Sequence, residues 1–174
     1  MKKVYIVLTY SGTVLSNIIK RFTKAEYCHC SISLDKDLKQ MYSFGRLNAY
    51  NPFIGGFTRE GTEFGTFKRF KNTKTAIYSL KVSNRCYKKI EEVIEDYKVN
   101  KHKYSYNLLG LITAMFGKRL KRRHHKYCTE FVQDVLDKAE IKNDLPKVPK
   151  PKDFTKIKDT ELIYRGILRK YNKT

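Results

Sequence analysis

The sequence predicts an α+β fold in which helices pack against an antiparallel β-sheet or small barrel. Three observations support this fold class. Several short segments alternate with the two-residue period of strands, and two of them form a hairpin pattern around a polar turn. Other segments carry the apolar stripe of amphipathic helices. The 174-residue chain shows no internal repeat or linker, so we expect residues 1–174 to form one domain.

Strands are predicted where β-branched and aromatic residues alternate or form a short buried run. These segments are residues 4–10, 26–34, 41–46, 64–70, 75–82 and 161–168. In EYCHCSISL (26–34), the alternation predicts that His29 points away from the apolar side of its strand. Cys28 and Cys30 share the apolar side with Ile32, so we expect both thiols to face the core.

Helices are predicted for residues 14–22, 85–100, 106–117 and 127–139. Residues 106–117 are almost entirely apolar, which predicts a largely buried helix. The helix at 127–139 is amphipathic, with an apolar side made of Phe131, Val132, Val135 and Leu136. Residues 48–61 are rich in glycine and predict an irregular loop. Prolines in residues 146–154 predict an extended connection along the surface.

The composition limits the classes of function. A net charge of +20 and a pI near 9.8 favour anionic partners. Lysines are spread along the chain, so only the basic run KRLKRRHHK (118–126) is informative, and without interleaved aromatic residues it indicates a solvated basic turn rather than a nucleic-acid site. Four cysteines are too few for a disulfide scaffold, and we expect reduced thiols. No apolar run reaches the roughly 20 residues that span a bilayer, so we expect a soluble, cytoplasmic protein.

Cys128 and His29 are the candidate catalytic pair. A cysteine is a good nucleophile only as a thiolate, which a positive field and a nearby base favour. Cys128 falls in the first turn of a predicted helix, directly after the basic run, where unpaired backbone N–H groups favour an anion. His29 lies within a predicted strand that would hold its ring rigidly. The alternative is structural: a buried cysteine in the core and a histidine bonded to a backbone carbonyl.

A third polar group should orient the imidazole of such a pair. Ser43, on the neighbouring hairpin strand, is the first candidate, and Glu60, at the end of the glycine-rich segment, is the charged alternative. The spacing does not decide between them. Tyr42, Arg46 and Tyr127 are candidate walls of a substrate pocket because they are close to these residues in the sequence.

Metal and cofactor sites are not predicted. Six residues could in principle supply ligands: Cys28, His29, Cys30, His124, His125 and Cys128. Neighbours in a strand point to opposite faces, however, and neither a CxxC nor an HxxxH spacing is present. Cys86 lies at a predicted helix start with no histidine close to it in the sequence.

Short motifs resemble the permuted papain-like branch of the NlpC/P60 superfamily, the YaeF/YiiX-like amidase group. EYCHCSISLD (26–35) is similar to the histidine strand of that group, MYSFGR (41–46) to the strand that follows, and YCTEFV (127–132) to its nucleophile helix; VPKPKDF (148–154) is similar to a later proline-containing stretch. The resemblance covers about residues 3–155. It implies a circularly permuted papain-like fold, Cys128 as nucleophile, His29 as base and a third residue at Ser43.

The expected activity is therefore hydrolysis of an amide by a cysteine amidase or peptidase acting on a peptide, an amino-acid amide or a related acyl substrate. Two alternatives stay open. One is a binding module for anionic polymers or lipids with a weak or absent catalytic site. The other is acyl transfer, or thioester or lipid hydrolysis, by the same Cys–His pair. The substrate and the oligomeric state do not follow from the sequence.

Overall fold

The computed structural model describes residues 1–48, 50–51 and 54–173. Its centre is a six-stranded antiparallel sheet in the order β4-β3-β2-β1-β5-β8. The strands are β1 (Lys2–Tyr10), β2 (His29–Ser33), β3 (Met41–Arg46), β4 (Gly55–Glu60), β5 (Lys74–Val82) and β8 (Thr160–Ile167). The predicted α+β class with an antiparallel sheet is confirmed. The small barrel is not: within the described residues the sheet stays open, with β4 and β8 at its edges.

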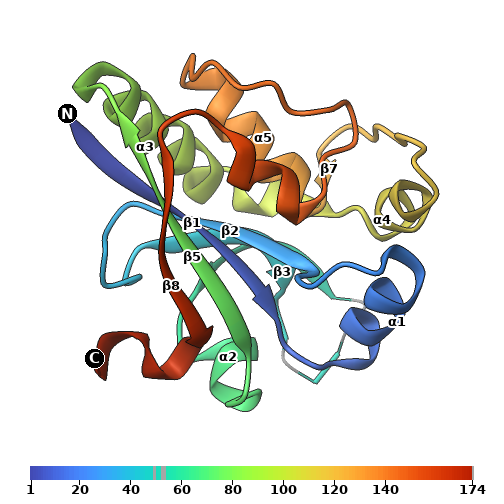
Figure 1. Cartoon of the computed structure of the whole chain (residues 1–174). Helices are drawn as coiled ribbons and strands as arrows, with labels where there is room; N and C mark the ends of the chain where they lie inside the picture. The colour runs from blue at the N-terminus through green and yellow to red at the C-terminus, as the bar shows by residue number, and fades with distance from the viewer. Residues whose placement is uncertain (49, 52–53, 174) are drawn as a thin grey trace.

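Helices lie on both faces and at one end of the sheet (Figure 1). The helical elements are α1 (Val14–Thr23), α2 (Gly65–Arg69), α3 (Asn84–Val99), α4 (Leu108–Met115), α5 (Cys128–Lys138) and the short 3-10 helices η1 (Lys101–Lys103), η2 (Pro151–Lys156) and η3 (Leu168–Lys173). A small parallel pair, β6 (Ser105–Tyr106) and β7 (His125–Lys126), lies just before α5. The helix α3 begins as expected, because the Ser83 side chain accepts a hydrogen bond from Cys86 N.

The main core lies between one face of the sheet and the helices α3 and α5. Alternate residues of β1, namely Val4, Ile6 and Leu8, point into it. The predicted inward side of α5 is fully buried there. A smaller cluster on the opposite face contains Tyr5, Val7 and Phe67 from β1 and α2. The alternation of β1 therefore contributes to two apolar layers.

Two predictions in the middle of the chain were wrong. Residues 64–70, predicted as a strand, contain the helix α2. Phe64, Phe67 and Phe70 recur every three residues, which suits a helical turn better than a strand, and Gly65 supplies the positive φ of 60° at its start. Residues 48–61, predicted as a loop, contain β4, which pairs along its whole length with β3. Residues 49, 52 and 53 of that segment lie outside the described part.

Gly55, the first residue of β4, has no room for a side chain. A Cβ atom at Gly55 would lie 2.8 Å from Tyr106 Cβ and 2.9 Å from the carbonyl oxygen of Gly45. Close packing thus requires glycine at position 55, although glycine lowers strand propensity.

The apolar stretch at 106–117 is less buried than predicted. The helix it contains, α4, buries Leu111, while Leu109, Ile112 and the following Phe116 are exposed. The apolar side of α1 is also exposed at Val14 and Phe22. These helices lie together beyond the end of the sheet, where no further layer formed by the described residues covers their outer faces (Figure 1).

Candidate active site

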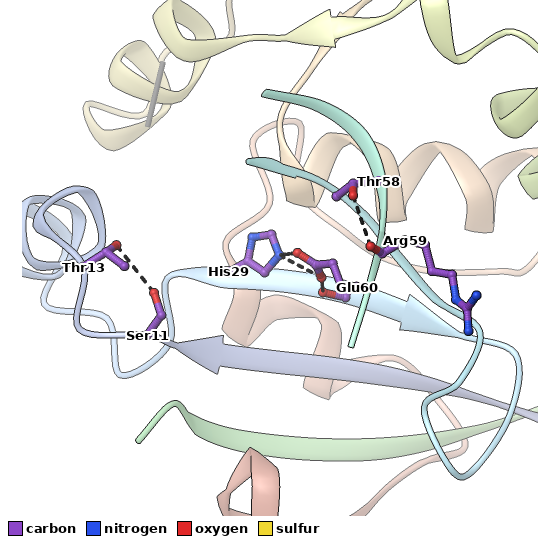
Figure 2. Close-up of polar contacts among 7 residues, drawn as sticks. Ser11, Thr13, His29, Thr58, Arg59 and Glu60 are labelled. Carbon is purple, nitrogen blue, oxygen red and sulfur yellow. Dashed lines mark hydrogen bonds and ion pairs between the residues drawn. The ribbon is translucent and has the colours of Figure 1, made fainter. Parts of the chain in front are cut away.

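His29 and Glu60 meet on the face of the sheet opposite the main core. His29 is the first residue of β2 and Glu60 the last of β4, with β3 between these strands. The His29 Nε2 atom lies 2.9 Å from Glu60 Oε1 and 3.2 Å from Glu60 Oε2 (Figure 2). The His29 side chain is 22% exposed and that of Glu60 10% exposed. The pair is thus largely screened from water, but the imidazole remains accessible.

Neighbouring residues hold Glu60 in this position. Ser31 Oγ donates a hydrogen bond to Glu60 Oε2 at 2.5 Å. The buried Ser43 hydroxyl forms no hydrogen bond of standard geometry, although it is close enough to contribute to the lowered pKa of Glu60. Gly45 provides the space, because a Cβ atom there would lie 3.1 Å from Glu60 Oε1 and 3.5 Å from His29 Cε1.

The pKa values of the two groups shift in directions that favour an imidazolium–carboxylate pair. Burial by itself would lower the pKa of His29, but the charges of Glu60 and Cys128, together with the hydrogen bond to Glu60 and the nearness of the Cys128 thiol, raise it well above its ordinary value. Burial also opposes the charge of Glu60. The His29 charge and the hydrogen bonds from His29 and Ser31 outweigh that effect and lower the pKa of Glu60.

Cys128 is the first residue of α5, and its thiol is buried at 3% exposure. The helix starts there because Tyr127 is extended, with φ −111° and ψ 174°, and its N–H donates to Glu130 Oε2 at 3.3 Å. The thiol therefore lies at the positive end of the helix dipole. Burial raises the pKa of Glu130 at this end, and the hydrogen bond from Tyr127 N–H and the charges of Lys126 and Arg119 oppose that effect.

Cys128 lies close enough to His29 for the charge of its thiolate to act on the imidazole. No hydrogen bond of standard geometry joins these two described side chains. Such bonds are often long or poorly aligned before substrate binds. Because Nε2 of His29 faces Glu60, Nδ1 is the ring nitrogen available to the thiol.

Two neighbouring cavities meet near this pair. The first, which we call the His29 cavity, has about 600 Å³ of empty space, part of it open to solvent. Its walls include His29, Glu60, Arg46, Thr9, Thr13 and Tyr106. The second, the Cys128 cavity, has about 470 Å³ of empty space, part of it open to solvent, and lies between α1, α4 and the segment 148–151. Its walls include Cys128, Tyr127, Thr129, Leu111, Met115 and Pro149. Ile19 and Cys28 line both cavities, so the histidine and the cysteine open onto adjoining spaces.

The three predicted pocket residues occupy different positions. Arg46 lines the His29 cavity, and Tyr127 lines the Cys128 cavity. Tyr42 lies in the main core, where its ring stacks on Phe57 at 5.9 Å between centroids. It is not among the described residues that line either cavity.

Tyr106 is a site residue that the sequence did not indicate. It lines the His29 cavity, and its pKa is raised well above the ordinary value by burial and then by the charge of Cys128. The pairing of β6 with β7, in which Tyr106 lies opposite Lys126, brings it beside the start of α5. No sequence motif marks such a two-residue strand.

Of the remaining cysteines and histidines, Cys28 borders both cavities, whereas the other described ones line neither. Cys30 is buried in the main core, and Cys28 Sγ donates to the carbonyl oxygen of Ser16 at 3.3 Å. His124 packs against the ring of Tyr104, and His125 Nδ1 contacts the carbonyl oxygen of Arg123. Within the part of the chain that the structure describes, no three His, Cys, Asp or Glu side chains are grouped as metal ligands.

No family model, curated protein or solved structure matches this chain. Among the helices of the described residues, none combines the length and the apolar character needed to cross a bilayer.

Proposed function

We propose that this protein is a cysteine-dependent amidase or peptidase in which Cys128 is the nucleophile, His29 the general base and acid, and Glu60 the orienting group. One observation carries the proposal. The His29 imidazole contacts a carboxylate through Nε2 and is influenced by the thiol of Cys128, although the three residues come from distant segments of the chain. A nucleophile, a base and a group that orients the base form the recurring arrangement of acyl-transfer enzymes.

In the proposed reaction, His29 Nδ1 takes the proton of the Cys128 thiol and the thiolate attacks the substrate carbonyl. Backbone N–H groups in the first turn of α5 stabilise the oxyanion. The imidazolium then protonates the leaving nitrogen, and the C–N bond breaks to leave a thioester on Cys128. His29 next removes a proton from a water molecule, which hydrolyses the thioester and frees the thiol.

The sequence resemblance to permuted papain-like amidases supports the same roles for Cys128 and His29, and with them the permuted papain-like fold. On that resemblance the third residue falls on Ser43. The direct contact of Glu60 with His29 favours the carboxylate instead, since a negative charge stabilises the imidazolium better than a hydroxyl does.

Site-resolved alkylation tests the proposal. At pH 6 we expect iodoacetamide to label Cys128 faster than Cys86, although Cys128 is buried and Cys86 is partly exposed. An ordinary thiol, with a pKa near 8.5, reacts slowly at this pH. Cys86 is a matched control because it also lies in the first turn of a helix. The His29→Ala variant should lose the fast labelling of Cys128 and keep the slow labelling of Cys86. Equal rates at the two thiols would refute the proposal.

A second candidate function, binding to an anionic lipid surface, is favoured by the outer faces of α1 and α4. Six exposed apolar residues there form what we call the α1–α4 ridge: Val14, Ile18, Phe22, Leu109, Ile112 and Phe116. The rings of Phe22 and Phe116 lie 6.2 Å apart. Lys20 and Arg21 belong to the same helix as Val14, Ile18 and Phe22, and the basic run 118–126 follows Phe116 closely in the sequence. An apolar ridge accompanied by basic residues suits the interface of an anionic bilayer.

Vesicle sedimentation tests this second function. We expect binding to phosphatidylglycerol-containing vesicles and little binding to pure phosphatidylcholine. The double change Phe22→Ser and Phe116→Ser should weaken binding, whereas Val99→Ser, at an exposed apolar residue of α3, should not. If binding depends on salt but is unaffected by the double change, the protein is attracted to the vesicles only by non-specific charge interactions, and the ridge has no role in binding.

A further inference from the structure

Arg46 places a positive charge in the His29 cavity. It is the last residue of β3 and is partly buried. Its Nη2 atom donates a hydrogen bond to Thr13 Oγ1 at 2.7 Å. Among the described residues, no carboxylate lies within ion-pair distance of its guanidinium. A partly buried cation that has no carboxylate partner among the described residues loses hydration, and a bound anion would offset that cost.

A second guanidinium lies close to Arg46. Arg69, from the end of α2, packs over the ring of Tyr50 at 3.9 Å and lines an adjoining hollow together with Arg46. Burial lowers the pKa of Arg46, the charge of Tyr106 opposes this effect, and the charge of Arg69 adds to it. Two cations on one hollow repel each other, so an anion between or beside them would be stabilised by both.

The start of α1 adds donors to the same cavity. Thr13 caps this ten-residue helix, and the first backbone N–H groups of the helix point toward its N-terminal end. Thr9 also lines the cavity, and its hydroxyl is buried without a hydrogen-bond partner. The cavity thus combines a cation, a helix start and an unsatisfied hydroxyl group, all of which suit an oxyanion.

The chemistry of the pair determines which end of a substrate would lie there. In the proposed hydrolysis, His29 protonates the leaving nitrogen, so the leaving group must lie on the His29 side. The acyl group, bonded to Cys128 in the intermediate, must then lie toward the Cys128 cavity, whose walls are largely apolar. The two cavities therefore fit opposite ends of one substrate.

We propose that Arg46 binds the carboxylate of an amino acid leaving group, and that the substrate is an amino acid acylated on nitrogen by an apolar acyl group. This inference rests on the proposed function and specifies its substrate. The C–N bond of the amide breaks, water supplies the OH of the released acid, and the amino acid leaves with its amine protonated. The contact between Arg46 and the substrate carboxylate distinguishes this substrate from an amide of the same size that carries no negative charge.

Calorimetric titration of the Cys128→Ala variant tests the inference without requiring catalysis. The probes are N-hexanoylglycine, its neutral analogue N-hexanoylglycinamide, and N-hexanoylaminomethylphosphonate, all at one ionic strength. We expect the carboxylate to bind roughly 10- to 100-fold more tightly than the amide. In the Cys128→Ala background, the further change Arg46→Gln should remove the preference for the carboxylate over the amide. Arg46→Lys in the same background should retain part of this preference. Arg59→Gln, which removes the same charge from an exposed side chain directed away from His29, should leave it unchanged (Figure 2).

The outcomes separate this inference from the proposed function. Equal binding of acid and amide, or a preference that survives Arg46→Gln in a folded variant, overturns the inference even if Cys128 labels rapidly. If the phosphonate binds more tightly than the carboxylate, the site prefers a phosphate-bearing leaving group to an amino acid. That result also overturns the inference. A carboxylate preference that depends on Arg46 supports the anion site, even if Cys128 labels slowly and the proposed hydrolysis fails.

Discussion

The two faces of the sheet differ in how they use buried residues. The face under α3 and α5 is apolar, with large side chains such as Phe44, Phe131 and Tyr97 in contact with one another. The opposite face carries a set of buried hydroxyl residues on adjacent strands: Thr9, Ser31, Ser33, Ser43, Thr75 and Ser79. His29 and Glu60 lie at the end of this polar face.

The difference shows that the residues of the main core and the residues of the candidate active site can lie on opposite faces of one sheet. Apolar side chains beside Glu60 would leave its carboxylate without donors and raise its pKa. Ser31 instead donates to Glu60, and Gly45 leaves it space. We therefore expect substitutions in the main core to change mainly stability, and substitutions of the polar residues that contact Glu60 on the opposite face to change mainly activity.

The largest effect should come from Cys128→Ala. Loss of the nucleophile should reduce hydrolysis of an N-acyl amino acid by roughly 10⁴-fold or more. Thermal unfolding should be little changed, because Cys128 belongs to no ion pair among the described residues and lies at the edge of the core. Cys86→Ala is the control and should retain full activity. A comparable loss of activity in both variants would contradict the assigned role of Cys128.

On the apolar face, Phe131→Ala should lower the free energy of unfolding by about 3–5 kcal/mol. Phe131 is fully buried among aromatic rings, and its removal leaves a cavity. Urea denaturation measures the change. The remaining folded fraction should label Cys128 at the wild-type rate; a large change in that rate in folded protein would show that the two faces are not independent.

Glu60→Gln should reduce kcat by roughly 10²- to 10⁴-fold with a smaller change in KM. An amide can still contact the imidazole but does not stabilise its charged form, so the pH at which His29 loses its proton should fall. The measurement is the pH dependence of kcat/KM. An unchanged pH profile would return the orienting role to Ser43.

The pH dependence of stability should report the same pair. Since the folded pKa of Glu60 is lowered, its stabilisation is present above about pH 4.3 and is lost as the pH falls through the folded pKa. Since that of His29 is raised, its stabilisation is present below about pH 6.5 and is lost as the pH rises through the folded pKa. The stability difference between wild type and Glu60→Gln should therefore peak between about pH 4.3 and 6.5. A difference that is flat with pH would argue against a charged pair.

Ser43→Ala should have the smallest effect. Its hydroxyl lacks a standard hydrogen bond, so we expect kcat/KM to fall by no more than roughly 2- to 10-fold. Ser31→Ala is the matched comparison and should cost more, since Ser31 donates directly to Glu60. The reverse order would show that Ser43 is the main support of the site.

Parts of the fold could be predicted because local patterns and tertiary packing agreed. The alternation in residues 26–34 predicted that His29 and Cys30 would face opposite sides, and the periodicity of α5 predicted its buried side. The strand β4 was missed because Gly55 and Gly56 lower local strand propensity, while contacts with Tyr106 and Gly45 require glycine at position 55. The choice of Glu60 over Ser43 as the contact of His29 depended on that missed strand.

The sequence by itself determined that Cys128 begins a helix and that His29 points to the polar side of a strand, because capping and side-chain alternation act over a few residues. Only the tertiary structure decided that β4 carries Glu60 to His29 and that β6 carries Tyr106 to the start of α5. These placements depend on pairing between distant segments, whose free energy comes from close packing and hydrogen bonds that no local pattern encodes.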